Sequence, residues 1–265
     1  MKNIKFYCVT NKPINFLNHK HYNLAWVGKE ECPQNYIRCD IDDNIFYKEQ
    51  YYSELTFHYW YWKNLLTSEN QNEWIGFCQR RRYFVKDKIN QRVDLNNING
   101  LLLENFKEEW SQYESLICDP IQISGAKKVK IIKRGWRNIL KNPLVLFKEK
   151  NQNISFHFDM HHGYGNLDKA ILLLEQEDRN DFNDYVKTNI LFNPHIMFVS
   201  KKEIINKWFS ALFPWLERCE KKFGFENLKG YDRGRIYAYL AERYLSFWFK
   251  KYTNFKEQPW VFIDN

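Results

Sequence analysis

The sequence predicts an α/β fold in which helices flank a central sheet and a helical part follows toward the C-terminus. Two observations predict this fold class. Short apolar runs separated by Asn, Pro and Gly alternate with helical patterns in the first half of the chain, whereas helical patterns dominate the second half. The 265 residues contain no repeat and no low-complexity linker. We therefore expect a single domain over 1–265, with the α/β part in 1–120 and the helical part in 121–265.

The expected elements follow from apolar periodicity and from the residues that bound each run. Apolar runs of the strand type occupy residues 4–9, 25–27, 36–39, 73–78, 115–118 and 197–199. Helical patterns occupy residues 53–66, 166–177, 179–187, 201–222 and 232–251. Ser53 and Asn166 are the expected N-caps of the first two helices, because Ser and Asn side chains accept hydrogen bonds from the free N–H groups of a first turn.

Composition excludes several classes of protein. With 44% hydrophobic and 27% charged residues, the chain is neither disordered nor collagen-like. The N-terminus lacks the apolar segment of a signal peptide, and no apolar run approaches the roughly 20 residues of a membrane span. None of the six Cys stands in a C-x-x-C pair, so we expect a reducing cytoplasm and predict neither a zinc ribbon nor a disulfide framework. Ten Trp, 17 Tyr and 21 Phe exceed the usual needs of a core, so we expect some rings to face a ligand or a membrane.

Positive charge is concentrated in residues 127–150. This stretch holds nine Lys or Arg against one acid, Glu149, and so accounts for the whole net charge of +8. Apolar residues such as Trp136 and Leu140 interleave with the cations, so the segment can lie on anionic lipid headgroups. A solvated helix face that covers part of the core is the equally weighted alternative. Because the rest of the chain is neutral, we expect no nucleic-acid partner.

Three consecutive arginines, Arg80, Arg81 and Arg82, follow the expected strand at 73–78. Ligands of open α/β sheets bind outside the carboxyl ends of the strands, where guanidinium groups can grip a phosphate or diphosphate. In an extended backbone, Arg81 and Tyr83 share one side and the other two arginines share the opposite side. The alternative is that one arginine pairs with a carboxylate and the others are solvated.

The run 156–165 combines His157, Asp159, His161 and His162 just before an expected helix. If its backbone is extended, Asp159 and His161 lie on one face, which suits a general base with an orienting partner. A metal site would use the same atoms. A hydrogen-bonded turn before the helix is the structural alternative.

Two shorter motifs are weaker signals. Asp40, Asp42 and Asp43 follow a strand-like run in the Asp-x-Asp form with which many sugar-nucleotide enzymes hold a divalent cation against a diphosphate, so we expect Mg²⁺ or Mn²⁺ there. Metal-independent catalysis, with arginines in place of the cation, is the alternative. Asn193 and His195 precede a buried strand, where turn chemistry around the intervening proline also explains them.

Several motifs together resemble those of a known family. They include Asp-Asn-Ile at 43–45, Tyr-Trp-Tyr-Trp-Lys-Asn at 59–64, Arg-Arg-Tyr-Phe at 81–84, the paired histidines at 161–162, and the runs 193–198, 208–216 and 235–245. In this order they resemble a bacterial family long labelled only as a domain of unknown function, whose members are described as capsular, exopolysaccharide or lipooligosaccharide glycosyltransferases. The resemblance spans nearly the whole chain.

The resemblance implies a GT-A-like, Rossmann-like fold and a hexosyltransferase at the inner face of the cell membrane, which uses a nucleotide-sugar donor and a lipid-linked or polysaccharide acceptor. Residues 1–120 would then bind the donor, and 121–265 the acceptor. We assign donor binding to Thr10, Lys12, Asp43, Asn44, Glu54, Lys63, Arg80, Arg81, Arg82 and Tyr83. We assign catalysis to Asp159, His161, His162 and Asp168, and acceptor binding or related roles to Tyr164, Asn193, His195 and Arg243.

The chain departs from the family pattern at the expected base. The family tends to carry Glu-Asp-Leu after the paired histidines, whereas this chain has Gly-Asn-Leu at 165–167, so the base is expected at Asp159 or Asp168. Gln79 and Arg80 stand where the family usually has His-Tyr, and Ile196 where it has Asn. In the resulting scheme, arginines stabilise the departing diphosphate and Asp159 deprotonates the acceptor hydroxyl. Aromatic candidates for stacking on the substrates are Trp60, Trp62, Tyr83 and Tyr164.

Two other classes of function stay open. A non-catalytic module that binds glycans or a membrane surface would explain the aromatic residues and the basic segment without an acid–base group. A single-stranded nucleic-acid binder would explain arginines beside aromatic rings, but the confinement of the charge argues against it.

Overall fold

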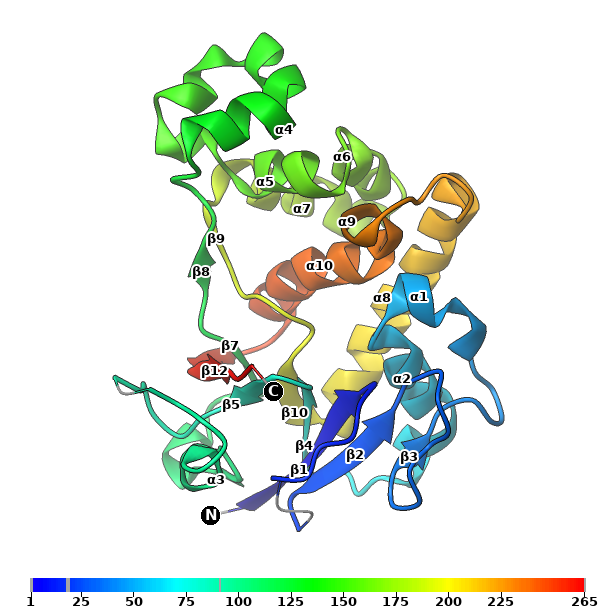
Figure 1. Ribbon diagram of the computed structural model, residues 1–265. Coiled ribbons are helices and arrows are strands. Elements are labelled where there is room, and N and C mark those ends of the chain that lie inside the picture. The colour runs from blue at the N-terminus through cyan, green and yellow to red at the C-terminus, as the bar shows by residue number, and fades with distance from the viewer. Residues whose placement is uncertain (1, 18–19, 91, 265) are drawn as a thin grey trace. The chain divides into compact units, whose positions relative to one another are not determined.

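The computed structural model describes residues 2–17, 20–90 and 92–264, and the chain forms two compact units (Figure 1). Unit 1 consists of Met1–Asp119, His195–Ala211 and Trp248–Asn265, and unit 2 of Pro120–Pro194 and Leu212–Phe247. The helices α8 (Lys202–Phe223) and α10 (Ile236–Tyr252) each begin in one unit and end in the other. Strands from the last third of the chain join the sheet of unit 1. Whether 1–265 acts as one domain stays a prediction.

Unit 1 is built on a mixed sheet whose main path runs β11–β7–β10–β4–β1–β2–β3 (Figure 1). The strands are β1 (Lys2–Thr10), β2 (Tyr22–Trp26), β3 (Ile37–Arg38), β4 (Trp74–Gln79), β7 (Ser115–Cys118), β10 (Phe198–Lys201) and β11 (Phe255–Gln258). Neighbours on this path are parallel except at β10, which is antiparallel to both β4 and β7. This confirms the predicted α/β class with a largely parallel central sheet.

Both faces of the sheet are covered, as its continuous apolar strands require. Along β1, successive side chains point to opposite faces. Phe6 stacks on Tyr22 of β2 and belongs to one buried cluster, whereas Tyr7 packs against Phe57 and Phe77 on the opposite face. All six residues of β4 are buried, which explains why the sequence shows an uninterrupted apolar run there.

The remaining elements of unit 1 are short. They are α1 (Glu49–Tyr52), α2 (Leu55–Trp60), a π-helical turn at Tyr61–Leu65, 3₁₀ turns at Phe46–Lys48, Leu66–Ser68 and Glu108–Trp110, α3 (Ile98–Leu101), β5 (Arg82–Phe84), β6 (Asn105–Phe106) and β12 (Trp260–Phe262). The prediction that Ser53 caps the helix through its side chain is wrong. Ser53 takes a positive φ of 53°, its carbonyl accepts a hydrogen bond from the Thr56 hydroxyl, and Glu54 is the residue at the N-cap.

Unit 2 is mainly helical. It contains α4 (Lys128–Lys141), 3₁₀ turns at Pro143–Leu146 and Glu149–Asn151, α5 (Ile154–His162), α6 (Asn166–Ile171), α7 (Gln176–Thr188), α9 (Tyr231–Gly234), the two-stranded sheet of β8 (Ile121–Gln122) with β9 (Leu191–Phe192), and parts of α8 and α10. Asn166 is the first residue of α6 and not its cap, which is Gly165 in the left-handed region. Asn166 instead donates its side-chain amide to the carbonyl of His162.

The C-terminal part is helical only as far as α10. Two strands follow that the sequence did not predict: β11 pairs in parallel with β7, and β12 pairs antiparallel with β5. Within residues 2–17, 20–90 and 92–264, no helix combines the length and the apolar character that crossing a bilayer requires.

Candidate functional site

The central strand β1 of unit 1 marks a topological switch point of the sheet. The chain proceeds from β1 to β2 on one side and returns to β4 on the other, and all three strands are parallel. Their carboxyl ends meet at one edge, where Val9 pairs with Gln79 and Thr10 with Trp26. Ligands of open α/β sheets bind at such an edge. We call the group formed there by Thr10, Lys12, Glu54, Gln79 and Arg80 the strand-end site.

Hydrogen bonds fix the strand-end site. The Thr10 hydroxyl accepts from the backbone N–H of Lys12 (3.1 Å), which turns the chain directly after β1. The Gln79 side-chain amide donates to a carboxylate oxygen of Glu54, and the backbone N–H of Arg80 donates to the β1 carbonyl of Val9 (2.8 Å). The strand-end site therefore brings together four of the predicted donor-binding residues, Thr10, Lys12, Glu54 and Arg80, from segments far apart in the sequence.

The arginine run is a hairpin turn, so the prediction of an extended backbone with alternating arginines is wrong. Gln79 pairs with Arg82, which leaves Arg80 and Arg81 as the two turn residues between antiparallel β4 and β5. Arg81, the second turn residue, takes a positive φ of 76°, a conformation that Gly or Asn usually supplies in turns. Tyr83, an expected donor contact, is fully buried, and its hydroxyl lies 3.4 Å from the Arg81 backbone nitrogen.

The C-terminal segment holds Arg81 in place. The guanidinium of Arg81 forms an ion pair with Asp264 and lies 4.6 Å from the centre of the Phe262 ring. The Arg81 carbonyl also accepts from the N–H of Ile263 (2.8 Å). Arg82 lies 5.5 Å from the same Phe262 ring. Arg80 is the arginine whose backbone N–H donates to β1, at the carbonyl of Val9 near the end of that strand.

The motif at 59–64 anchors the loop that carries Asp43 and Asn44. The Tyr59 hydroxyl donates to the Asp43 carboxylate (3.2 Å), and the Asn64 side chain donates to the Asp43 carbonyl (2.9 Å). Asn44 bonds within the loop, donating to the carbonyl of Asp42 (2.9 Å). The motifs at 43–45 and 59–64 therefore occur together for a structural reason, since side chains of the second hold the loop of the first by hydrogen bonds.

The loop at 40–43 does not present a ready metal site. Both carboxylate oxygens of Asp40 accept from Arg38 (3.0 and 2.9 Å), and these hydrogen bonds hold the pKa of Asp40 below its usual value. Asp42 adopts a positive φ of 54° in an exposed turn. In the described ranges, no group of three or more His, Cys, Asp or Glu side chains is arranged to hold a metal ion. Mg²⁺ or Mn²⁺ at Asp40 and Asp42 stays a prediction, and no step below uses it.

Unit 2 contains a pocket of about 570 Å³ between α4, α5 and the segment that leads into α9. We call it the cationic pocket, because five Lys or Arg line it against two acids. Its lining residues are Lys133, Arg134, Trp136, Arg137, Asp159, Met160, His161, Gly163, Tyr164, Lys229, Gly230, Tyr231, Asp232 and Arg233. Three predicted site residues, Asp159, His161 and Tyr164, therefore lie around one cavity.

Asp159 has the properties of a general base, but its partner is not the predicted one. Because residues 154–162 are helical, Asp159 and His161 do not share a face as they would in a strand. Asp159 instead accepts a hydrogen bond from the Gly165 N–H (2.8 Å). Burial raises the pKa of Asp159 to about 6, although the bond from Gly165 and one from Asn138 oppose the rise. A carboxylate with such a pKa suits proton abstraction near neutral pH.

The paired histidines are neutral and fixed by neighbours. Arg134 donates to Nδ1 of His161 (3.1 Å), which leaves Nε2 of that ring as its N–H donor. Burial, together with the charge of nearby cations, lowers the pKa of His161 to about 4. His162 donates from Nδ1 to the Asp232 carbonyl (2.8 Å) and stacks on Tyr239, and burial lowers the pKa of His162 to about 3.

Three other predicted residues of unit 2 do not line this pocket. Asp168 is exposed on α6 and lies 3.8 Å from the Lys187 ammonium. Arg243 is buried, forms an ion pair with Glu242 and lies over the Phe192 ring. Asn193 is fully buried and accepts from the Ser246 hydroxyl (2.8 Å).

In unit 1, two further residues have structural contacts. His195 has a positive φ of 68° and packs edge-on against Trp260. Lys63 is exposed, with its ammonium 3.9 Å from the centre of the Trp62 ring. Neither residue lies among the hydrogen bonds that define the strand-end site.

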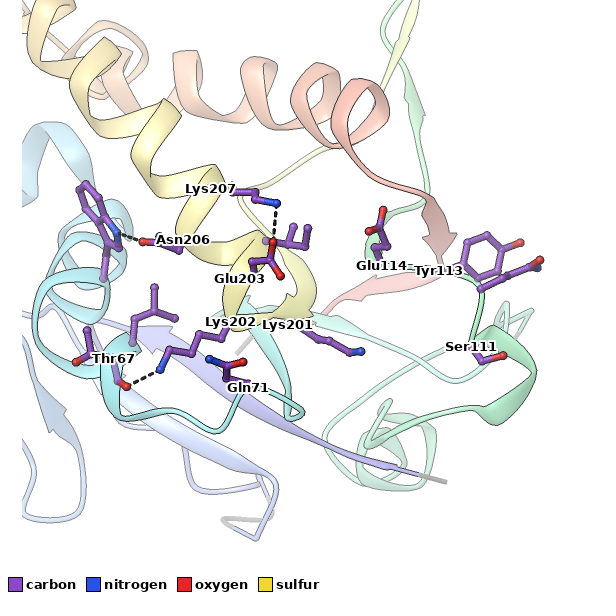
Figure 2. Close-up of a pocket in the computed structure, with 14 residues that line it drawn as sticks. Thr67, Gln71, Ser111, Tyr113, Glu114, Lys201, Lys202, Glu203, Asn206 and Lys207 are labelled. Atoms are coloured by element: carbon purple, nitrogen blue, oxygen red, sulfur yellow. Dashed lines mark hydrogen bonds and ion pairs between the residues drawn. The ribbon is translucent and has the colours of Figure 1, made fainter.

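A second cavity, of about 640 Å³, lies in unit 1 where β4 and β7 begin, at the edge opposite to the strand-end site (Figure 2). Two of its three lysines already bind polar groups of the protein. Lys202 donates to the Thr67 carbonyl, and Lys207 forms an ion pair with Glu203 (2.7 Å) (Figure 2). These contacts leave the cationic pocket as the better candidate for an anionic ligand.

Sequence reasoning missed part of both sites. The Gln79–Glu54 bond joins two segments whose contact only the fold creates. Lys229, Asp232 and Arg233 complete the cationic pocket, and a signal for them existed in the charged, glycine-flanked run at 229–235. From the sequence, this run predicts only the start of the helix expected at 232–251.

A comparison with solved structures finds one with a similar fold. The structure is similar to the WbbM bifunctional glycosyltransferase in its apo form, with a TM-score of 0.73 and 21% sequence identity. The similarity covers 100% of this chain and 46% of that one, so the chain spans less than half the length of the protein it matches. The fold is therefore the mixed α/β fold found in part of that glycosyltransferase.

The sequence itself matches a family model. The model, described as a domain of unknown function, DUF4422, matches residues 5–254, and the chain belongs to this family. This confirms the predicted membership of a family labelled as a domain of unknown function. No curated protein matches the sequence significantly.

Proposed function

We infer that the protein is a glycosyltransferase that moves a hexosyl group from a nucleotide sugar to a lipid-linked or polysaccharide acceptor in bacterial surface-glycan synthesis. The strand-end site carries this proposal, because a switch point edged with Thr10, Lys12 and Arg80 is where an α/β sheet binds a nucleotide. The likeness in fold to a glycosyltransferase supports it, and a GT-A-like fold is part of the proposal.

In this proposal, unit 1 binds the donor. The backbone bond between Arg80 and Val9 sets the Arg80 side chain to begin beside the end of β1, where its guanidinium can neutralise the diphosphate as the glycosidic bond breaks. Glu54, oriented by Gln79, is suited to bind a donor hydroxyl. Arg81, which the C-terminal segment holds, positions the hairpin.

Unit 2 supplies the base and binds the acceptor. Asp159 removes the proton of the attacking acceptor hydroxyl, and its raised pKa of about 6 matches that task. The sugar leaves the diphosphate, which takes the electron pair of the broken bond, while the new glycosidic bond forms to the acceptor oxygen. Asp168 is the second candidate for the base, because it is the first acidic residue after the paired histidines and lies in the first turn of α6.

The basic segment provides a membrane contact at the inner leaflet. Large apolar side chains on α4 and the turn after it are exposed, namely Val129 (76%), Ile132 (56%), Trp136 (52%), Leu140 (76%), Leu144 (46%) and Phe147 (73%). A cationic helix with exposed apolar side chains is typical of peripheral membrane binding.

A panel of nucleotide sugars tests the proposal. The purified chain, incubated with each member, should bind at least one and hydrolyse it slowly in the absence of acceptor. If no nucleotide sugar binds or reacts, the alternative of a non-catalytic module that binds glycans or a membrane surface gains support, and the exposed apolar residues of α4 favour its membrane form.

A further inference from the structure

Four of the five cations of the cationic pocket have no carboxylate partner among the residues that the structure describes. In the described part of the chain, Lys133, Arg137, Lys229 and Arg233 have no carboxylate within 4.0 Å, and the only pocket cation with an acidic neighbour is Arg134, 3.6 Å from Asp232. In the second cavity of unit 1, by comparison, Lys207 pairs with Glu203 and Lys202 donates to the Thr67 carbonyl. The cavity of about 570 Å³ is therefore lined by four cations that no described carboxylate neutralises directly.

The backbone of α4 is shaped to bring these cations together. Gly135 interrupts the helical geometry of α4 (φ −108°, ψ 16°). A Cβ at Gly135 would lie 3.2 Å from the Phe156 ring and 3.3 Å from Met160. Without a side chain, α4 approaches α5 closely at this point, and Lys133 and Arg134 on one side of the bend and Arg137 on the other all reach the same cavity.

Aromatic rings and a neutral N–H donor complete the lining. The Arg137 guanidinium lies 5.2 Å from the Trp136 ring centre and 5.7 Å from that of Tyr164, which restrains it at the wall of the pocket. His161, whose Nδ1 accepts from Arg134, retains an Nε2–H donor. Tyr231 is 67% exposed at the rim.

We propose that the cationic pocket binds the phosphoryl groups of a phosphorylated acceptor, with Lys133, Arg137, Lys229 and Arg233 as the cations that grip them. A diphosphate carries two to three negative charges, which matches an excess of three positive charges among the five cations and two acids of the lining. A single carboxylate would leave most of these cations uncompensated. This inference rests on the proposed function, since it names the substrate class that unit 2 would take.

The same helix indicates what the phosphoryl group is attached to. Trp136 lines the pocket and is also 52% exposed within the apolar stripe of α4 that includes Ile132 and Leu140. A ligand with its phosphoryl groups among the cations would have its other end beside this stripe. The acceptor therefore carries a lipid, so that one helix contacts both its charged and its apolar part.

Titration with inorganic pyrophosphate tests the pocket without any enzymatic turnover. The variant Lys229→Gln with Arg233→Gln removes two exposed cations from the rim, and Lys221→Gln with Lys222→Gln on α8 removes two exposed cations outside the pocket. At fixed ionic strength we expect pyrophosphate affinity, by calorimetry, to fall at least tenfold in the pocket variant and less than twofold in the control. Binding in unit 1 is common to all three proteins and cancels in the comparison. An equal loss in both variants overturns the proposal, because it reveals diffuse attraction.

Vesicles separate the two sources of phosphoryl groups. Binding to phosphatidylglycerol vesicles measures bulk headgroups, and the gain on adding a few per cent of a polyprenyl diphosphate measures the acceptor class. We expect the pocket variant to lose that gain while it binds the plain vesicles as the control variant does. If the two variants differ only on plain vesicles, the pocket binds headgroups and the proposal fails.

The result is independent of the proposed function. Slow hydrolysis of a nucleotide sugar by the unaltered protein reports on the donor site, whatever the pocket binds. Pyrophosphate binding reports on the pocket, even if no donor is ever turned over. A protein that hydrolyses a nucleotide sugar but binds pyrophosphate equally well in all three forms keeps the proposed function and loses this inference.

Discussion

The strand-end site and the cationic pocket are built in opposite ways. In the strand-end site, neutral amide groups fix the positions: the backbone N–H of Arg80 donates to a β1 carbonyl, and the Gln79 amide donates to Glu54. In the cationic pocket, charged side chains on helices face one another, and burial shifts the pKa of both Asp159 and His161. We therefore expect donor binding to depend little on pH, and turnover and acceptor binding to depend strongly on pH and salt.

Replacement of the expected base should have the largest effect. Asp159→Asn keeps the size of the side chain and removes its ability to take a proton, so we expect kcat to fall about 10²- to 10⁴-fold. In the unaltered protein, kcat should rise with pH through about 6, because only the ionised carboxylate is active and burial raises its pKa to that value. Steady-state kinetics between pH 5 and 8 would measure both effects.

The same variant should leave the donor site untouched. Donor affinity, measured by calorimetry, should change less than twofold in Asp159→Asn. Asp168→Asn is the matched control for a nearby carboxylate, and it should keep the rise in kcat near pH 6. If Asp168→Asn abolishes turnover and Asp159→Asn does not, the base lies on α6.

Two neighbouring arginines sharpen the contrast within unit 1. Arg80→Gln should weaken donor binding by about 1.5–3 kcal/mol, or roughly 10- to 150-fold, as the loss of a hydrogen bond to a charged group does. Arg81→Gln removes the ion pair with Asp264 and should change donor affinity far less. Calorimetric titration with the donor at pH 6 and pH 8 should give the same ratio at both values. A larger loss of donor affinity in Arg81→Gln than in Arg80→Gln would mean that Arg81, and not Arg80, contacts the donor.

How far the sequence predicts these sites depends on whether local pattern and tertiary packing agree. The strand-end site was predictable because β1, β2 and β4 are apolar runs whose carboxyl ends must meet in a parallel sheet. The hairpin was not, since two arginines occupy a turn for which Gly or Asn is the usual signal. Helix α5 was not predictable either, because Phe156, Phe158 and Met160 alternate like a strand, whereas in the structure every residue of this helix is buried or partly buried.

His58 makes the stability of unit 1 depend on pH, although donor binding in the same unit is expected to depend on it little. Its ring is fully buried beside Phe77 and Phe209, and among the described residues neither ring nitrogen has a hydrogen-bond partner. Burial lowers the pKa of His58 to about 3. The pKa of His58 in the folded protein lies below its value near 6.5 in the unfolded chain. The contribution of neutral His58 to the free energy of unfolding is therefore fully present above pH 6.5 and is lost as the pH falls toward the folded pKa. At pH 5 the loss from this one residue is about 2 kcal/mol.

His58→Phe should remove that loss. The free energy of unfolding in urea should fall between pH 8 and pH 5 by about 2 kcal/mol less in the variant than in the unaltered protein. The histidines of unit 2, whose pKa values burial also lowers, contribute equally to both proteins. Identical pH dependence in the two proteins would show that His58 already titrates in the folded state.

The smallest expected effect concerns the membrane contact of α4. Two variants separate its electrostatic part from its apolar part. Lys130→Gln removes one exposed charge outside the pocket and should weaken binding to phosphatidylglycerol vesicles by about 1 kcal/mol at low salt. Since a Debye length near 10 Å screens such charges at 0.1 M salt, this loss should shrink as salt is raised. Leu140→Ser removes an apolar side chain that is 76% exposed, so its loss should persist at high salt. Equal salt dependence of the two variants in a sedimentation assay would mean that the apolar stripe never enters the bilayer, and α4 would then be a solvated face.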